Sequence, residues 1–479
     1  MLTKSMKCVT RAFFDKGSHM RHISTFLDPN SEMIALASYA NTKNLLLTAF
    51  EIKGPFEDGL VKPFVMAAVE IFPQLRSHLR EIRKNGRYHL YWQSSPEIEF
   101  PVNESDLKDY KASIPTLDAV ISHLAPRLDR DWNLFEEPPG EVHLVRMSPG
   151  RRIVVAVIHH AVFDAATASE FGRHCFVRYR ELLTGVKDDF PGLMTHGVST
   201  SRKRTVKIRS RKWEDIIHAG RLAVMPLISK PTLPAGSGMP NDLRQYHIKR
   251  VLSEEETTRI AISSPRSGGS FVDILVASSN LAIDRWNQRR NMETGTVTTA
   301  LTVNIRGRYQ SLDHSNNVSA LFFESSSKER NDRKQLVHSL STCRIRQFRK
   351  QMDLKQYENV ARMISCASVL PFNLRRKMAY KITQKHKCSI AITLLGVVWP
   401  VMKNGKPTLD SYPTCVGETQ IPEIYGTGYK PLTSTPLLLI VYSFLNRLNF
   451  ILAASASLFT REEADDFMDL FMNVLREDV

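Results

Sequence analysis

The sequence predicts a mixed α/β protein built from two substantial halves. Segments with strand-like apolar patterning alternate along the chain with segments whose apolar residues recur at helical spacing. The chain has 479 residues, and at roughly 100 to 200 residues per domain this length corresponds to about two to four folded units. A composition of 42% hydrophobic and 24% charged residues is typical of globular proteins, so collagen-like, low-complexity and wholly disordered chains are excluded.

The first half is expected to contain two hairpins among its strands and helices. Asn85-Gly86 supplies the positive backbone angles of a tight two-residue turn, which places the first hairpin around it. The second hairpin is expected across residues 148–150, and its second strand is apolar on both faces, which predicts a central position in a sheet. The expected elements are a strand at 44–52, a helix at 58–71, and hairpin strands at 75–83, 88–93, 141–147 and 152–158.

Beyond residue 165 the spacing becomes helical as far as Gly185, a residue that commonly ends a helix. The pattern then weakens, and seven basic residues fall within eleven positions, at Arg202, Lys203, Arg204, Lys207, Arg209, Arg211 and Lys212. We interpret this stretch as the connection between the halves. The expected organisation is an N-terminal extension at 1–34, a first half at 35–190, a basic linker at 191–245 and a second half at 246–479.

The second half again mixes helices and strands. Its last helix is expected to begin at Thr460, because Thr460 and Glu463 form a capping box in which each side chain binds the other residue's exposed amide. The other expected elements are helices at 271–289, 334–349 and 357–364, a strand at 298–305, and buried strands at 389–398 and 437–442.

The formal net charge of +16 favours anionic partners without choosing among nucleic acid, a membrane surface, an acidic protein and a phosphorylated cofactor. For the basic run we favour a solvated linker over contact with an acidic protein, the phosphates of a cofactor or a membrane. No groove-reading motif accompanies it, so nucleic-acid binding is not expected. Peripheral contact with a membrane stays open, whereas a membrane-spanning segment is not expected, because the apolar stretches are too short or interrupted.

The six cysteines form no C-x-x-C pair, which argues against a zinc ribbon or a dithiol redox motif, and no metal site is expected. We interpret them as free thiols in a reducing compartment and expect a cytoplasmic monomer. The basic N-terminus lacks the apolar stretch of a secretory signal. Residues 17–20 spell GSHM, which resembles a cloning scar, and Met20 could be an alternative start, so whether residues 1–19 are native stays open.

One stretch has the composition of a catalytic site: His159-His160-Ala161-Val162-Phe163-Asp164-Ala165, where a buried strand gives way to a helix. A histidine at such a strand end can face a cleft while the sheet fixes its backbone, and a general base needs both reach and a pKa near the working pH. The alternative is a hydrogen-bonded loop with no catalytic part. A chance match to this pattern is expected in roughly a few chains per thousand of this length, so the motif is moderately specific.

This HHxxxD[GA] pattern resembles that of the chloramphenicol acetyltransferase-like superfamily, which includes condensation domains, BAHD acyltransferases, alcohol acetyltransferases and wax ester synthases. Other segments resemble elements of the same superfamily and appear in its order across about residues 35–475. They are Phe72–Leu79 (FPQLRSHL), Ser270–Ala277 (SFVDILVA), Thr302–Arg308 (TVNIRGR), and Tyr442–Phe459 with the capped helix that follows.

The resemblance implies two chloramphenicol acetyltransferase-like α/β sandwich halves that form a V with a central tunnel. It implies that His160 is the general base, that His159 is mainly structural, and that Asp164 forms a salt bridge with Arg76 or Arg306. Helix capping is the alternative role for Asp164. Thr393, Asn304 and Ala165 are the residues expected to line the substrate tunnel.

The implied activity is transfer of an acyl group from a coenzyme A or phosphopantetheinyl carrier-protein thioester to a hydroxyl or amine, with no bound cofactor. Two alternatives stay open: a free-standing peptide-synthetase condensation enzyme whose donor and acceptor are both carrier-bound, and a non-catalytic module that recruits a carrier protein. Any carrier protein would act in trans. The sequence departs from the pattern where Ala165 replaces the usual glycine and where Asn316-Asn317 replaces a common Gly-Asn. A third departure is the segment ITLLG at 392–396, where related groups have SNLG.

Overall fold

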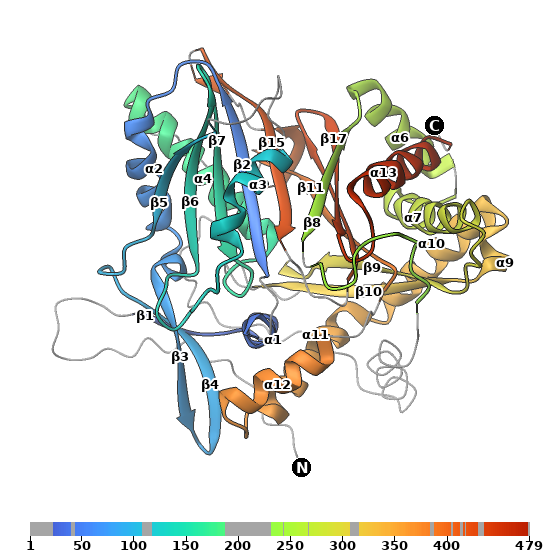
Figure 1. Ribbon diagram of the computed structural model, residues 1–479, viewed down its shortest axis with the longest axis horizontal. Coiled ribbons are helices and arrows are strands. Elements are labelled where there is room, and N and C mark those ends of the chain that lie inside the picture. The colour runs from blue at the N-terminus through green and yellow to red at the C-terminus, as the bar shows by residue number, and fades with distance from the viewer. Residues whose placement is uncertain are drawn as a thin grey trace.

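Two six-stranded sheets form the centres of two α/β halves that lie side by side (Figure 1). This computed structural model describes residues 23–39, 44–107, 117–186, 231–242, 244–266, 268–306, 316–383, 388–403, 406–411, 415–416, 418–429 and 435–477. The basic run at 202–212, most of the expected linker and residues 1–22 lie outside these ranges, so the expected domain boundaries stay a prediction.

The sheet of the first half has the strand order β14-β15-β2-β7-β6-β5. Its strands are β14 (Cys415–Val416), β15 (Thr419–Tyr429), β2 (Leu45–Lys53), β7 (Arg151–His159), β6 (Gly140–Ser148) and β5 (Val102–Asp106). The prediction that β7 is central is confirmed, since it pairs with β2 on one side and β6 on the other and its apolar residues are buried. Helices α2 (Val61–Val69) and α4 (Ala165–Thr184) pack on each other beside this sheet (Figure 1). Another helix of this half is α3 (Leu117–Leu128).

The sheet of the second half has the strand order β10-β9-β11-β16-β17-β8. Its strands are β10 (Val318–Ser325), β9 (Val297–Asn304), β11 (Ile390–Val397), β16 (Leu437–Phe444), β17 (Arg447–Ser455) and β8 (Gln245–Val251). Three adjacent strands, β9, β11 and β16, run parallel, whereas the other pairings are antiparallel. Helices α6 (Glu254–Arg266), α7 (Phe271–Gln288), α10 (Arg333–Arg349) and α13 (Arg461–Arg476) gather beside this sheet (Figure 1).

Smaller elements connect the two halves. Helix α1 (Pro29–Ser38) packs against α11 (Met352–Ala367) and α12 (Phe372–Thr383), so a segment from the start of the chain lies against helices of the second half (Figure 1). The remaining elements are β1 (Ile23–Phe26), β3 (Ser77–Lys84), β4 (Arg87–Ser94), β12 (Pro400–Lys403), β13 (Lys406–Ser411), α9 (Ser327–Arg330), and the short 3-10 helices η1 (Asp58–Leu60) and η2 (Pro73–Arg76). Of the described helices, none combines the length and apolarity that crossing a bilayer requires.

Strand β15 crosses between the halves. It comes late in the sequence, yet it pairs antiparallel with β2 of the first half, with Gly426 opposite Thr48 and Tyr429 opposite Leu45. The sequence division at 35–190 and 246–479 does not include this exchange, because an antiparallel pairing of strands more than 300 residues apart leaves no local signal. Strand β15 therefore places residues of the second half next to β2.

Several sequence predictions are confirmed. Asn85 and Gly86 have positive φ values of 52° and 75° in the turn between β3 and β4. Gly185 ends α4 in the left-handed conformation. Thr460 and Glu463 form the expected capping box of α13. The five cysteines in the described part of the chain are free thiols.

His247 of β8 joins the second-half sheet to the crossing strand, since its Nε2–H donates to the Gly428 carbonyl oxygen at 3.2 Å. The side chain is buried, and burial lowers its pKa from 6.5 to about 4. The unfolded chain therefore binds more protons than the folded chain below pH 6.5, and stability is lost as the pH falls toward 4.

We expect this histidine alone to cost about 2 kcal/mol of stability by pH 5. His247→Gln keeps a donor near the Nε2 position and does not titrate, so its melting temperature is expected to fall less between pH 7 and pH 5 than that of the wild type. The measurement is thermal unfolding of both proteins across this pH range. Parallel curves for the two proteins would contradict the assignment.

Candidate active site

The two-histidine motif lies where β7 ends and α4 begins. His159 is the last residue of β7, and the His160 amide donates to the Asn44 carbonyl oxygen at 2.7 Å just before β2. The Val162 amide donates back to the His159 carbonyl at 3.0 Å, which closes a tight turn. The strand pairing on both sides of β7 therefore fixes the backbone of both histidines.

His159 is buried within this turn. Its Nδ1 accepts a hydrogen bond from the Ala161 amide at 3.1 Å, so the proton of the neutral ring is on Nε2. Burial, with a smaller contribution from His160, lowers the pKa of His159 to about 3. A neutral, enclosed side chain bound to the backbone fits the structural role expected for His159.

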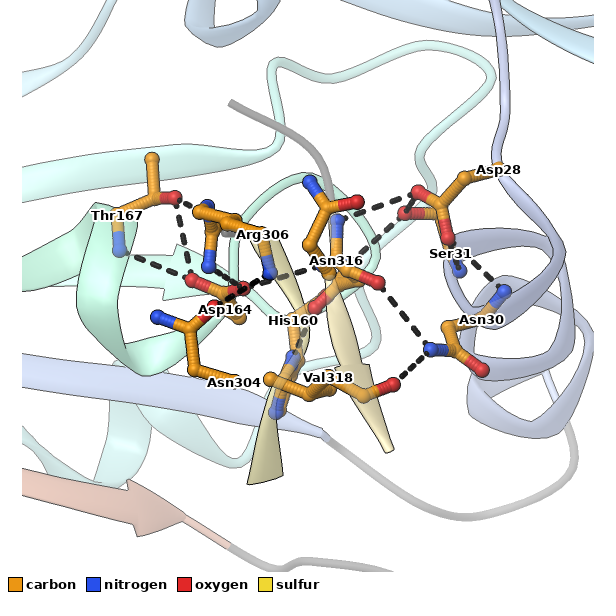
Figure 2. Close-up of polar contacts among 11 residues, drawn as sticks. Asp28, Asn30, Ser31, His160, Asp164, Thr167, Asn304, Arg306, Asn316 and Val318 are labelled. Atoms are coloured by element: carbon orange, nitrogen blue, oxygen red, sulfur yellow. Dashed lines mark hydrogen bonds and ion pairs between the residues drawn. The ribbon is translucent and has the colours of Figure 1, made fainter. Parts of the chain in front are cut away.

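His160 is only partly buried, and its ring is oriented by Asn316 (Figure 2). Its Nδ1 lies 3.1 Å from the Asn316 Oδ1. The side-chain nitrogen Nδ2 of Asn316 donates to the His160 carbonyl oxygen at 2.7 Å and to Ser31 Oγ at 2.9 Å, so both of its hydrogens have acceptors. The atom facing His160 is therefore an acceptor, and Nδ1 must hold the hydrogen. In a neutral ring the lone pair would then be on Nε2, which points away from Asn316 in Figure 2.

Asn316 is itself held by the start of α1 (Figure 2). Its backbone amide donates to Asp28 Oδ2 at 3.2 Å, and its backbone carbonyl oxygen accepts from Asn30 Nδ2 at 3.1 Å. Asp28 also caps α1 by accepting from the amides of Asn30 and Ser31. Because Asn316 has no exposed surface and several partners, its side-chain amide has little freedom to rotate away from His160.

Asp164 forms a buried ion pair with Arg306, which follows β9 of the second half. Arg306 Nη1 lies 2.6 Å from Asp164 Oδ2, and both side chains are at most 7% exposed. Asp164 also accepts from the Thr167 amide at 3.0 Å as the cap of α4, and from the Asn317 amide at 3.2 Å. Asp164 thus has both of the roles weighed from the sequence, and the pair joins the halves beside the histidine turn.

A cavity of about 230 Å³ adjoins His160 between the halves. Its wall is mainly apolar, and its described ionisable side chains are His160, Asp164, Tyr425 and Tyr442. The lining comprises residues of β2 (Leu45, Leu46, Leu47, Thr48), α4 (Ala165, Ala168, Ser169), the second-half sheet (Thr302, Val318, Ala391, Thr393, Leu395, Leu438, Ile440) and β15 (Ile424, Gly426, Thr427, Gly428). The His160 side chain therefore borders an apolar space large enough for part of a small organic molecule.

The family model of the Condensation domain matches residues 38–300, more than half of the chain. The chain belongs to the condensation domain family.

Solved structures agree with this assignment at the level of the fold. The first condensation domain of the CDA synthetase has a TM-score of 0.68 and 14% identity, with 95% of this chain and 96% of that chain covered. The trichothecene 15-O-acetyltransferase TRI3 from Fusarium sporotrichioides has a TM-score of 0.69 and 10% identity, covering 98% of this chain and 97% of that one. A starter condensation domain of rhizomide synthetase, in complex with C8-CoA and Leu-SNAC, has a TM-score of 0.59 and 13% identity, covering 95% and 94%.

The predicted fold class of two chloramphenicol acetyltransferase-like α/β halves is confirmed by these matches. A search of curated proteins found no significant match.

The structure places the other predicted site residues of this condensation domain in different surroundings. Ala165 and Thr393 line the cavity. Asn304 is exposed, is not among the lining residues, and accepts from the Arg306 amide at 3.0 Å. Arg76 has a different partner, since its Nε donates to the Ile98 carbonyl oxygen at 2.9 Å. Of the two arginines considered from the sequence, Arg306 is the one paired with Asp164.

Sequence reasoning missed the contact between Asn316 and His160 and the contribution of β15 to the cavity. The replacement of a common Gly-Asn by Asn316-Asn317 was the available signal for the first. For the second, glycines at alternate positions in Tyr425-Gly426-Thr427-Gly428-Tyr429 are typical of a strand that another group approaches closely.

Removing the Asn316 side chain tests its effect on His160. Asn316→Ala is expected to lower kcat about ten- to hundredfold, because Nδ1 loses its acceptor and the ring can adopt unproductive orientations. KM is expected to change much less, since the side chain is enclosed behind the ring and lies outside the cavity lining. Steady-state kinetics and thermal unfolding are measured together. A lower melting temperature with unchanged kcat would show that Asn316 only stabilises the fold.

Proposed function

We propose that this condensation domain is an acyltransferase that moves an acyl group from a coenzyme A or carrier-protein thioester to a hydroxyl or amine, with His160 as the general base. The observation that carries the proposal is the contact of His160 Nδ1 with the Asn316 side-chain oxygen at 3.1 Å. Asn316 holds the hydrogen on Nδ1, which leaves the Nε2 lone pair available beside the cavity between the halves. A base of this kind must have a free lone pair within reach of the proton that it abstracts.

The proposed reaction needs no covalent enzyme intermediate. Nε2 of His160 takes the proton from the acceptor hydroxyl or amine while that oxygen or nitrogen attacks the thioester carbonyl carbon. The carbon–sulfur bond then breaks as the carbonyl re-forms, and the imidazolium returns the proton to the departing thiolate. The products are an ester or amide and a free thiol, so atoms and protons balance.

Asp164 is proposed to act through position and to take no proton. Both of its oxygens are engaged by Arg306, Thr167 and Asn317, and the side chain has no exposed surface. Its negative charge is balanced by Arg306. The ion pair therefore supports the turn that presents His160.

The identity of the donor thioester belongs to the proposal. The rhizomide synthetase relative was solved with C8-CoA and Leu-SNAC, and another matching structure is a four-domain nonribosomal peptide synthetase. Both coenzyme A and a carrier protein in trans are therefore considered as donors. Inhibition by free coenzyme A would identify the first, and inhibition by an apo carrier protein the second. We also propose that the enzyme acts in the cytoplasm, because its described cysteines are free thiols.

The test is a product screen with the full chain. Acyl-coenzyme A and acyl-carrier thioesters are incubated with mixed alcohols and amines, and mass spectrometry detects new esters or amides and released thiol. The wild type is expected to form a product with one class of donor, and His160→Ala is expected to form little. Equal product from both proteins would contradict the role of His160. Carrier binding without any product or thiol release would favour the non-catalytic recruiting module.

A further inference from the structure

Two glycines of the crossing strand open the cavity beside His160. Gly426 and Gly428 are two positions apart on β15, so they face the same side of the sheet, and both line the cavity. In Figure 1 this strand lies next to β2. Neither glycine has a positive φ, so backbone conformation does not require glycine at either position. Glycine weakens the interior of a strand and often marks a site that another group approaches closely. We therefore attribute this pair of glycines to the space that the missing side chains leave in the cavity.

The space that these glycines leave is bounded by leucines. A Cβ at position 426 would lie 3.7 Å from Leu395 Cδ1, and a Cβ at position 428 would lie 3.5 Å from Leu438 Cδ2. Both distances are ordinary van der Waals contacts, so alanine fits at either position. A larger side chain would extend into the cavity. Side-chain size at 426 and 428 therefore controls the volume available to an occupant.

The lining also limits the chemistry of the occupant. Asp164, the one lining carboxylate among the described residues, already pairs with Arg306, so an ammonium group inside would have no free counter-ion. Burying an unpaired charge is costly, which disfavours a charged aminoacyl group. Along β2 the lining extends from Leu45, opposite His159, to Thr48. Three residues of strand span about 10 Å, which suits an extended chain with its reacting end at His160.

We propose that this cavity binds an uncharged hydrocarbon chain and that Gly426 and Gly428 set the longest chain that it accepts. The inference rests on the proposed acyltransferase function and gives that function a substrate class. The chain belongs either to the acyl group of the thioester or to the alcohol or amine acceptor. Both have the same chemistry at the cavity wall.

The test measures binding, so it does not depend on turnover. Calorimetry with the full chain uses two series of probes, namely unreactive S-alkyl pantetheine thioethers from ethyl to octyl and 1-alkanols of the same lengths. In the wild type each methylene that enters the cavity is expected to raise affinity about fourfold. The gain is expected to stop when the chain fills the cavity.

Gly426→Ala and Gly428→Ala are expected to reach this limit at a shorter chain than the wild type, and Gly426→Val at a shorter one still. Gly59→Ala is the matched control, because Gly59 is exposed and a Cβ there has no neighbour within 4 Å. Should Gly426→Val fail to fold, Gly426→Ala decides, since its new methyl group makes only an ordinary contact.

A shifted limit in the thioether series assigns the chain to the acyl donor, and a shifted limit in the alkanol series assigns it to the acceptor. Either result supports the inference. The same limit in the wild type and in a folded Gly426→Ala protein, or no dependence on chain length in the wild type, would overturn it. His160→Ala is expected to keep the wild-type limit. If that variant also kept wild-type turnover, the proposed function would fail while the binding site remained established.

Discussion

Replacing His160 with alanine is expected to lower kcat about a hundred- to ten-thousandfold, the usual contribution of a general base. The variant removes the Nε2 lone pair and leaves the turn in place, because the turn is held by backbone hydrogen bonds of His159, His160 and Val162. Folding is therefore expected to survive. The measurement is initial rate at saturating donor and acceptor, with melting temperature recorded beside it.

His123→Ala is a matched control for this variant. His123 is also partly buried, but its Nε2 contacts Ser105 Oγ at 3.0 Å, away from the cavity. Its turnover is expected to stay close to that of the wild type. A His160→Ala enzyme that remained within a few-fold of the control would remove His160 from the proposed mechanism.

Asp164→Ala is expected to have the largest effect on stability, lowering the free energy of unfolding by about 3 to 5 kcal/mol. The substitution leaves the Arg306 guanidinium charged and unbalanced in the interior. It also removes the side chain that caps α4 by accepting from the Thr167 amide. Activity is expected to fall with stability, because the same contacts support the histidine turn. Denaturant midpoints and turnover are measured on the same preparations.

Two further variants distinguish the effect of breaking the ion pair from the effect of removing any buried polar side chain. Replacing both partners, with Asp164→Ala and Arg306→Met together, is expected to recover part of the stability, since no unpaired charge is then left in the interior. Arg76→Ala removes the other arginine considered from the sequence, whose Nε hydrogen bond goes to the Ile98 carbonyl oxygen, and is expected to cost only about 1 kcal/mol. Equal midpoints for the Asp164 and Arg76 variants would contradict this account.

The parts of the fold that the sequence predicted depend on local interactions. The turn at Asn85-Gly86 needs two residues that tolerate positive φ, and the cap at Thr460 needs a partner only three positions away. Strand β7 was recognisable because a strand buried on both faces is apolar throughout. The position of His160 directly after that strand followed from the same local pattern.

The parts that the sequence did not predict depend on contacts between distant segments. Arg76 and Arg306 were equivalent by motif position, and only the packing of the two halves brings Arg306 to Asp164. The interaction of Asn316 with His160 joins residues 156 positions apart. Asn304 was expected in the tunnel, but an exposed position at the end of β9 takes it out of the cavity lining. No local pattern encodes such distances or directions.

Strand β15 has a consequence for how enzymes of this build can be recombined. A fragment ending at Gly185 would expose the edge of β2 that normally pairs with β15, and unpaired edges of this kind promote aggregation. A chimera that joined the first half of this chain to the second half of a relative would replace Thr419–Tyr429 and, with it, part of the cavity wall beside His160. If the proposed function holds, substrate preference would then follow the second parent even though His160, the proposed general base, came from the first. The module to exchange is therefore the first half together with Thr419–Tyr429.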